Sequence, residues 1–142
     1  MSFVKIWIHA VWGTKYREHV LEKTMLESVC DHIMENGKLK GIFIHCINGY
    51  SDHLHCLMLL HADTSISKQM QLIKGESSFW INKNKILRGR FEWADEYFAS
   101  SVSEDKLDIV RAYIMNQQEH HKKVTFKDEY EKFLKHVGFD QG

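Results

Sequence analysis

The spacing of apolar residues changes several times along this chain of 142 residues, and this limits the possible folds more than any other feature. An alternating pattern is typical of a strand with one buried face, whereas spacings of three and four residues are typical of an amphipathic helix. Residues 4–12 and 41–48 are rich in strand-forming side chains, and residues 18–37 and 65–84 have helical spacing. The sequence therefore predicts a fold that contains both strands and helices.

Turn and capping residues separate the expected elements. Gly37 is expected to end the first helix, Asn48-Gly49 to form a hairpin turn, and Ser103 to cap a third helix. In chain order, the expected elements are a strand over 4–12, a helix over 18–37, strands over 41–48 and 53–60, a helix over 65–84, a strand over 91–99, and helices over 103–121 and 126–136.

The order of these elements, β-α-β-β-α-β followed by C-terminal helices, is that of a ferredoxin-like or RRM-like α+β sandwich. Its sheet is antiparallel, and we expect helices on one face. The other face would then be left for a ligand, a partner or a second copy. A chain of 142 residues supplies one hydrophobic core, so we expect residues 1–142 to form a single domain.

Charge and composition exclude several classes of function. Lys plus Arg and Asp plus Glu both count 19, so no overall charge indicates a nucleic-acid or membrane partner, and any such surface must be local. The sequence shows no membrane-spanning apolar run, no resemblance to a targeting peptide and no CxxC pair among its three cysteines. We therefore expect a cytoplasmic protein without a membrane partner. No glycine-rich phosphate loop is present, so no nucleotide cofactor is expected.

The most informative motif is His53-Leu54-His55. On a strand the two histidines share one face, about 6.6 Å apart, and Leu54 points to the other face. Two imidazoles at that spacing can converge on one metal ion, although a stable site needs a third ligand. A solvated strand face is the alternative, and the triplet alone favours it. His9 also lies on a predicted strand, and we expect it in the core.

A second motif lies on the helix predicted over 103–121. Tyr113, Gln117 and His120 share one polar face beside a buried stripe. A tyrosine one turn before a glutamine, at the edge of a buried helix, is a suitable position for a nucleophile. The alternative is a tyrosine that packs with its hydroxyl at the surface, and the pattern alone favours it. His120 and His121 form a weaker metal pair, because adjacent helical side chains point about 100° apart.

Together, His53-Leu54-His55 and Tyr113-Ile114-Met115-Asn116-Gln117 resemble the motifs of the HUH single-tyrosine transposases of small bacterial insertion sequences, a group that includes the REP-associated tyrosine transposases. The resemblance covers nearly the whole chain. Further segments that resemble the family, in the same order, are residues 12–17, 74–78, 80–82, 96–103 and 116–121.

The resemblance implies a role for each matching residue. Tyr113 would be the nucleophile, and His53, His55 and Gln117 would hold a divalent metal, Mg²⁺ or Mn²⁺. The chain would act as a homodimer on single-stranded DNA hairpins, and would cleave and rejoin DNA at element ends through a 5′-phosphotyrosine intermediate. Two alternatives remain open: a domesticated protein that binds DNA or RNA hairpins without mobility, and a small metal-binding scaffold.

Basic residues that could hold DNA occur in two places. Residues 83–90 carry four positive and no negative charges, and two more basic residues follow the first predicted strand. Phosphate contacts of this kind make affinity depend on salt, although a solvated loop fits the run equally well. Trp80, Phe91 and Trp93 could stack on unpaired bases, but core packing is favoured. The candidate DNA-binding residues are Lys15, Arg17, Lys83, Lys85, Arg88 and Arg90.

Overall fold

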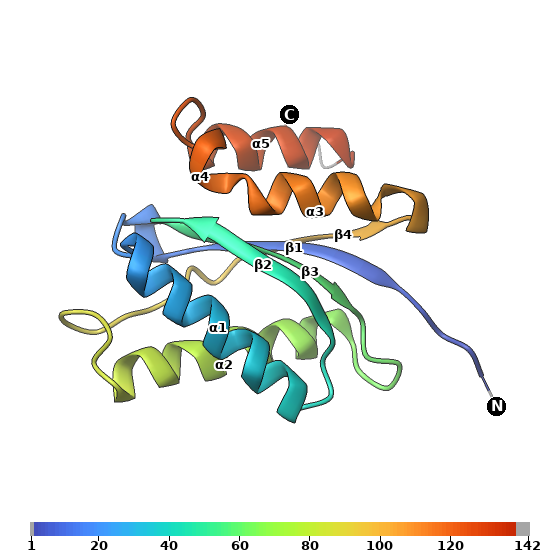
Figure 1. Ribbon diagram of the computed structural model, residues 1–142, viewed down its shortest axis with the longest axis horizontal. Coiled ribbons are helices and arrows are strands. Elements are labelled where there is room, and N and C mark those ends of the chain that lie inside the picture. The colour runs from blue at the N-terminus through green and yellow to red at the C-terminus, as the bar shows by residue number, and fades with distance from the viewer. Residues whose placement is uncertain (1, 139–142) are drawn as a thin grey trace.

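The computed structural model describes residues 2–138, and its centre is a four-stranded sheet (Figure 1). The strands are β1 (Trp7–Gly13), β2 (Ile44–Tyr50), β3 (His53–Leu59) and β4 (Phe98–Val102). They lie in the order β2-β3-β1-β4, and each adjacent pair is antiparallel. This is the strand arrangement of a ferredoxin-like sandwich, so the predicted α+β fold class is confirmed.

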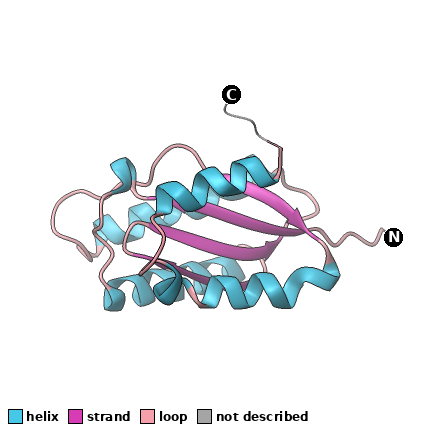
Figure 2. Cartoon of the chain, turned by 90° about the horizontal axis from the view of Figure 1, so that it is seen from above, coloured by secondary structure: helices cyan, strands magenta, loops and turns pink. Residues whose placement is uncertain are grey.

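Helices cover both faces of the sheet. They are α1 (Lys23–Leu39), α2 (Ile66–Lys83), α3 (Leu107–Met115), α4 (Gln117–His120) and α5 (Phe126–His136), with short 3₁₀ helices η1 (Lys15–Arg17) and η2 (Glu104–Lys106). Helices α1 and α2 lie on one face, and α3–α5 lie across the other (Figures 1 and 2). The last helix, α5, has the predicted bounds, but the expectation of a free second face is wrong. None of the described helices has both the length and the apolar character needed to cross a bilayer.

Strand β1 is buried along its whole length, so its side chains pack against other elements on both faces of the sheet. Ile8, Ala10 and Trp12 point toward α1 and α2 and belong to the main core. Trp7 and Val11 point the other way and pack in two smaller clusters against the C-terminal helices. Burying a large apolar side chain contributes about 1.5–3 kcal/mol, so an uncovered second face would lack several such contributions.

The hairpin between β2 and β3 turns three residues later than predicted. Asn48 and Gly49 lie inside β2, and the turn is formed by residues 51–52. Gly49 pairs with Leu54, and a Cβ at this glycine would collide with the carbonyl oxygen of His53. The glycine therefore permits a close strand approach, and sheet register overrides the local turn preference.

Two boundaries of α1 also differ from the predicted ones. The helix begins at Lys23, after an extended approach, and it continues past Gly37 to Leu39. A Cβ at residue 37 would lie 3.1 Å from the carbonyl oxygen of Ile42, so this glycine serves close packing rather than termination. The chain reverses instead at Gly41, where φ is +74°, a conformation that favours glycine.

The strand predicted over 91–99 is shorter and begins later, because β4 starts only at Phe98. An irregular segment precedes it. Lys74 of α2 holds this segment by donating from its Nζ to the carbonyl oxygens of Ala94 at 2.6 Å and Asp95 at 2.9 Å. These backbone groups are therefore satisfied by a side chain rather than by a neighbouring strand.

The helix predicted over 103–121 is interrupted at Asn116, which separates α3 from α4. Asn48 of β2 donates from its Nδ2 to the carbonyl oxygens of Ile114 and Met115, each at 3.2 Å. The last carbonyl groups of a helix lack partners within the helix, and Asn48 supplies one for two of them. The break therefore lies beside β2, where it fixes the direction of α4.

Candidate metal centre and nucleophile

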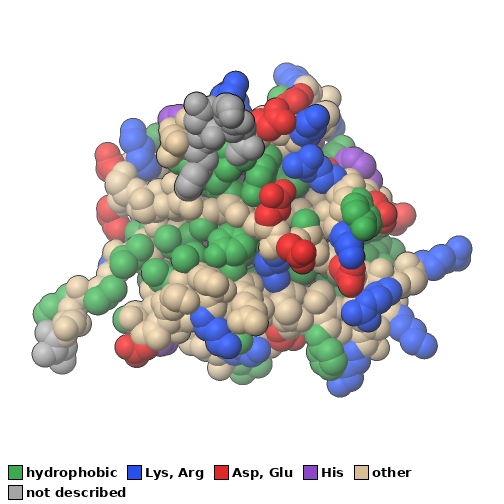
Figure 3. Space-filling model, turned by 180° about the vertical axis from the view of Figure 1, so that it is seen from behind, with side chains coloured by type: hydrophobic (Ala, Val, Ile, Leu, Met, Phe, Trp, Pro, Cys, Tyr) green, Lys and Arg blue, Asp and Glu red, His purple; other side chains and the backbone are tan. Residues whose placement is uncertain are grey.

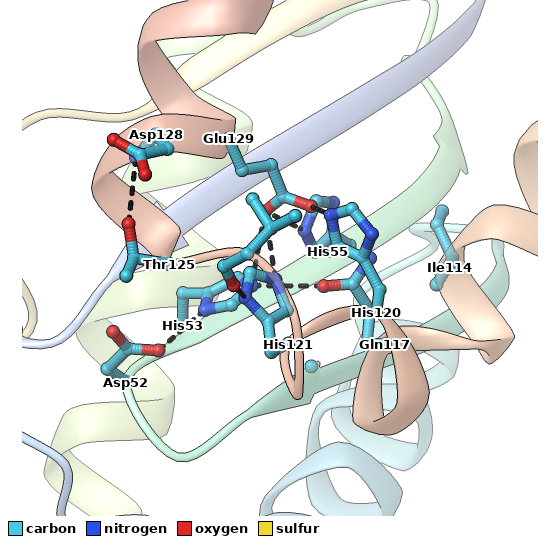
Figure 4. A network of polar contacts seen from close by, with 12 residues as sticks. Asp52, His53, His55, Ile114, Gln117, His120, His121, Thr125, Asp128 and Glu129 are labelled. Atoms are coloured by element: carbon cyan, nitrogen blue, oxygen red, sulfur yellow. Dashed lines mark hydrogen bonds and ion pairs between the residues drawn. The ribbon is translucent and has the colours of Figure 1, made fainter.

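The two histidines of the His53-Leu54-His55 triplet lie on one face of β3, beneath the C-terminal helices (Figure 4). Both side chains have 0% exposure, so this strand face is not solvated. The His53 ring stacks on the Phe126 ring at a centroid separation of 4.2 Å. Gly13 of β1 pairs with His53 and leaves room for that phenyl ring, because a Cβ at Gly13 would lie 2.6 Å from Phe126.

Hydrogen bonds from the Nδ1 atoms orient two imidazoles of the site. His53 Nδ1 lies 2.7 Å from Asp52 Oδ1, and His121 Nδ1 lies 2.6 Å from the carbonyl oxygen of Val124. A carboxylate and a carbonyl oxygen only accept, so each Nδ1 carries the hydrogen and donates it. The Nε2 atoms of both rings are thereby left to face the centre of the cluster.

His9 of β1 supports the second histidine of the triplet. Its Nε2 lies 2.9 Å from His55 Nδ1, and the two rings stack with centroids 5.2 Å apart. His9 is buried, as expected, but it also belongs to the polar network of the site. With His9 as acceptor, His55 keeps its Nε2 free on the side of the cluster, which is the arrangement that a metal ligand needs.

Glu129 of α5 reaches into the middle of these imidazoles (Figure 4). Its Oε1 lies 3.0 Å from His55 Nε2, 3.2 Å from His121 Nε2 and 3.4 Å from His53 Nε2. One ligand atom from each of these four residues lies within 4.8 Å of the others, so the group could hold a metal ion. Glu129 is not among the predicted site residues. The sequence feature that could have identified Glu129 is its position three residues after Phe126, on the apolar face of the last helix.

Gln117, the predicted third ligand, is fully buried at the start of α4. Its Oε1 lies 3.1 Å from His53 Nε2, and its Nε2 donates to the carbonyl oxygen of Tyr113 at 3.3 Å. The second bond leaves the amide oxygen on the side of the cluster. Gln117 therefore offers one more oxygen ligand beside the imidazoles.

The Tyr113 side chain is half-buried and points into the cluster rather than to the surface. Its hydroxyl donates to Glu129 Oε2 and lies 3.3 Å from His120 Nε2. The Tyr113 ring meets the His55 ring edge-on, with centroids 5.6 Å apart. The predicted nucleophile and the predicted imidazole pair thus meet within one chain.

The electrostatics of the cluster keep the phenol protonated. Burial opposes ionisation of Glu129, but hydrogen bonds from His121, His53 and His55 outweigh it and hold the pKa of the carboxyl far below its usual range. Burial and the neighbouring carboxylate together raise the pKa of the Tyr113 hydroxyl well above its ordinary value. The bare cluster is therefore unfavourable for a phenolate, and a positive charge at the imidazoles would offset the carboxylate.

Burial affects the histidines unequally. It lowers the pKa of His55 to about 4, against an opposing contribution from Glu129, and the pKa of His9 to about 3. Burial also disfavours charged His53, but hydrogen bonds to Asp52 and Glu129 outweigh it and raise the pKa of that imidazole. His55 is therefore neutral at physiological pH, as ligation requires.

A comparison of the sequence with protein families identifies the family of this chain. The model of the IS200-like transposases matches residues 2–117. The chain belongs to the IS200-like transposase family. Its members are enzymes that cut and join DNA strands, so the predicted enzyme class is confirmed. The match ends at Gln117, before His121 and Glu129.

Individual relatives of the transposase agree with this assignment. It is 24% identical to the ISDra2 transposase TnpA of Deinococcus radiodurans over 117 residues, which cover 78% of this chain and 83% of the relative. A crystal structure of a candidate transposase from Deinococcus radiodurans R1 has a TM-score of 0.64 and 23% identity, and covers 82% of this chain and 93% of that one. A REP-associated tyrosine transposase bound to a REP hairpin also has a TM-score of 0.64, with 15% identity and coverage of 87% and 73%. The two structures share the fold.

Four of the candidate DNA-binding residues of the transposase already have partners, and one of them, Lys83, holds its Nζ over the Phe79 ring, 5.8 Å from the centroid. Lys15 Nζ lies 2.6 Å from Glu92 Oε2, and Arg90 Nε lies 3.6 Å from Glu92 Oε1, so one carboxylate offsets two charges. The Arg17 guanidinium lies over the Phe126 ring, 5.7 Å from its centroid, next to the helix that carries Glu129. Arg17 is thus the basic candidate that contacts an element of the cluster.

Lys83, Lys85 and Arg88 are exposed, and in the part of the chain that the structure describes no ion pair involves them. Several basic side chains gather at the end of the molecule opposite the N-terminal segment (Figure 3). Phe91 and Trp93 are buried in the main core, and Trp80 stacks on His32 with ring centroids 4.1 Å apart. These aromatic rings pack within the protein, as favoured from the sequence.

Proposed function

We propose that this transposase cleaves and rejoins single-stranded DNA beside hairpins at element ends, with Tyr113 as the nucleophile. The observation that carries the proposal is the position of the Tyr113 hydroxyl on a buried cluster of imidazoles and one carboxylate, all from one chain. Half-buried Tyr113 and His120 lie on the side of the cluster that is open to solvent. A scissile phosphate would approach from that side.

The donor set of the cluster suits a divalent ion, and we propose Mg²⁺ or Mn²⁺ held by His53, His55 and Gln117. Two imidazole nitrogens and an amide oxygen converge there, and hydrogen bonds to Asp52 and His9 orient the two rings. When bound, such an ion polarises a phosphate oxygen and offsets the charge that develops on the phosphate.

The chemistry of the chain's own residues is a balanced exchange of phosphate esters. The Tyr113 oxygen attacks the scissile phosphorus, the bond from phosphorus to the 3′ oxygen breaks, and a 5′-phosphotyrosine forms. The phenolic proton is released to water on the open side of the site, and the released 3′ oxygen takes a proton from water. Attack by a different 3′-hydroxyl on the phosphotyrosine reverses the step and joins the strands without an energy-supplying cofactor.

The DNA partner is proposed to lie along the basic residues of η1 and of the segment after α2. Lys15 and Arg90 line a groove of about 1190 Å³ that runs beside α2, together with exposed Tyr16 and Phe79. Positive side chains would hold the backbone, and exposed rings would stack on bases. One tyrosine per chain must serve two DNA ends, so we propose that the working unit is a homodimer.

The decisive experiment uses single-stranded hairpin oligonucleotides copied from the DNA that flanks the gene. The protein is incubated with each oligonucleotide and Mn²⁺, and the products are separated on a denaturing gel. We expect a covalent protein–DNA band that Tyr113→Phe lacks, whereas His53→Ala loses the band but still binds the hairpin. Tyr130→Phe, which removes a hydroxyl from a buried ring of α5, is the matched control and keeps the band. Hairpin binding with no covalent band in the wild type would support the alternative of a domesticated hairpin-binding protein.

A further inference from the structure

His121 and Glu129 lie beyond the part of the chain that the family model matches, yet both reach the imidazole pair. We propose that these two residues, in place of Gln117, complete the metal centre. The ion is then held by three imidazole nitrogens, from His53, His55 and His121, and by the Glu129 carboxylate, and it is a transition ion such as Mn²⁺ rather than Mg²⁺. This inference rests on the proposed function for the role of the ion but not for its binding.

The distances around Glu129 Oε1 agree with a shared ion. The three Nε2 atoms lie 3.0, 3.2 and 3.4 Å from this oxygen. Ligands that each lie about 2.1 Å from one ion are separated by roughly 3.0–3.5 Å from their neighbours. These three distances are therefore compatible with a shared ion, whose ligand atoms would come from β3, from the residue after α4 and from α5.

The hydrogen-bond donors and acceptors of the cluster also favour a bound ion. His53 and His121 each use their Nδ1 hydrogen on an acceptor outside the cluster, Asp52 and the Val124 carbonyl. Once the Nε2 hydrogens are lost, as metal ligation requires, each Nε2 presents a lone pair to Glu129 Oε1, which is itself an acceptor. Buried lone pairs that face one another are unfavourable, and a cation between them turns each such contact into an attraction.

The second carboxylate oxygen connects this centre to the nucleophile. Glu129 Oε2 accepts from the Tyr113 hydroxyl and lies 3.0 Å from His120 Nε2. A ligand that uses Oε1 on the ion keeps Oε2 for the phenol. Glu129 thus acts both as a ligand and as the group that positions Tyr113 beside the ion.

The composition of the donor set determines which ions fit. Imidazole nitrogens suit later transition ions such as Zn²⁺, Fe²⁺ and Ni²⁺ best, and affinity for them rises from Mn²⁺ to Co²⁺. Mn²⁺ still accepts nitrogen ligands more readily than Mg²⁺, which prefers oxygen ligands and gives up its water reluctantly. A third imidazole therefore shifts preference away from Mg²⁺. Four protein ligands leave two positions of a six-coordinate shell for a phosphate oxygen and a water.

Metal binding tests the inference without reference to cleavage. The full chain, stripped with a chelator, is titrated calorimetrically with Mn²⁺, Co²⁺ and Mg²⁺. We expect Mn²⁺ and Co²⁺ to bind at least tenfold more tightly than Mg²⁺. Glu129→Gln and His121→Asn should each weaken Mn²⁺ binding at least tenfold. Glu131→Gln, an exposed glutamate on the same helix, is the matched control and should bind as the wild type does.

The outcomes separate the two proposals. If Glu129→Gln and His121→Asn bind Mn²⁺ as the wild type does while His53→Ala does not, the inference is wrong and the smaller site with Gln117 stands. If His53→Ala also binds normally, both metal assignments are wrong. Pulsed electron paramagnetic resonance of the Mn²⁺-loaded wild type counts the ligating imidazoles and needs no variant to fold. Three imidazoles are expected, and two would overturn the inference.

Discussion

The Tyr113 hydroxyl donates a hydrogen bond to the Glu129 carboxylate, and this contact joins the proposed nucleophile on α3 to a residue on α5. Glu129 is 3% exposed, so little water competes for the contact. A buried negative charge beside a phenol favours the protonated form of the phenol. The reactivity of Tyr113 therefore depends on what occupies the imidazole side of the carboxylate.

The first prediction concerns this contact in metal-free protein. Glu129→Gln should lower the pKa of the Tyr113 hydroxyl toward its ordinary value, because the variant removes the negative charge that disfavours the phenolate. The measurement is the ultraviolet absorbance of tyrosinate as pH rises, taken as the difference between Glu129→Gln and Glu129→Gln/Tyr113→Phe. If the difference between the wild type and Tyr113→Phe gives the same curve, burial alone sets this pKa.

The second prediction concerns acid stability of the metal-free protein. Burial lowers the pKa of His9 to about 3 and that of His55 to about 4, so between pH 6.5 and 5 the unfolded chain binds protons that the folded chain does not. The free energy of unfolding should fall as pH falls through that window, by up to about 1.4 kcal/mol per pH unit for each histidine. The pKa of His53 is raised in the folded protein, so this imidazole keeps its proton throughout the window and contributes no destabilisation as the pH falls.

Urea denaturation at pH 6.5, 6.0, 5.5 and 5.0, with a chelator present, measures this dependence. His9→Gln cannot take up a proton in either state, so its slope with pH should be smaller than that of the wild type. Equal slopes in the two proteins would mean that His9 does not remain neutral inside the fold.

How far the site could be predicted depends on which side chains lie on one element. The pairing of His53 with His55, and of Tyr113 with Gln117, follows from periods of two and 3.6, which are local properties of a strand and a helix. Glu129 reaches the cluster only because α5 packs back across β1 and β3, which no local pattern specifies. Its one signal is an acidic residue on an apolar helix face.

The turn predicted at Asn48-Gly49 is wrong for the opposite reason: the local preference for a turn is real, but strand pairing overrides it. An Asn-Gly pair favours a tight turn, yet pairing of Asn48 with His55 and of Gly49 with Leu54 extends β2 through both residues. That extension places Asn48 against the end of α3. The strand register that makes the turn prediction wrong therefore also brings Asn48 to the helix that carries Tyr113.

The third prediction tests this support. Asn48→Ala removes the side-chain donor to the carbonyl oxygens of Ile114 and Met115, and should destabilise the protein by about 1 kcal/mol. Strand cleavage should fall more than hairpin binding, because the break after α3 positions Tyr113. Asn84→Ala is the matched control, since Asn84 donates to a helix carbonyl, that of Trp80, far from the cluster. Chemical denaturation and the gel assay measure the two effects. Equal cleavage by both variants would remove the link between Asn48 and the nucleophile.

The fourth prediction concerns the exposed lysines after α2. Lys83→Gln/Lys85→Gln should weaken binding of a single-stranded hairpin oligonucleotide, because each lysine that contacts a phosphate releases counterions on binding. The slope of log affinity against log salt should become shallower by about 0.7 for each single-strand phosphate that the variant no longer neutralises. Lys38→Gln/Lys40→Gln, at the end of α1, makes the same change of charge elsewhere and should leave the slope unchanged. Fluorescence anisotropy at several salt concentrations gives both affinity and slope. If the two double variants shift the slope equally, the basic segment acts only through net charge and does not itself bind phosphate.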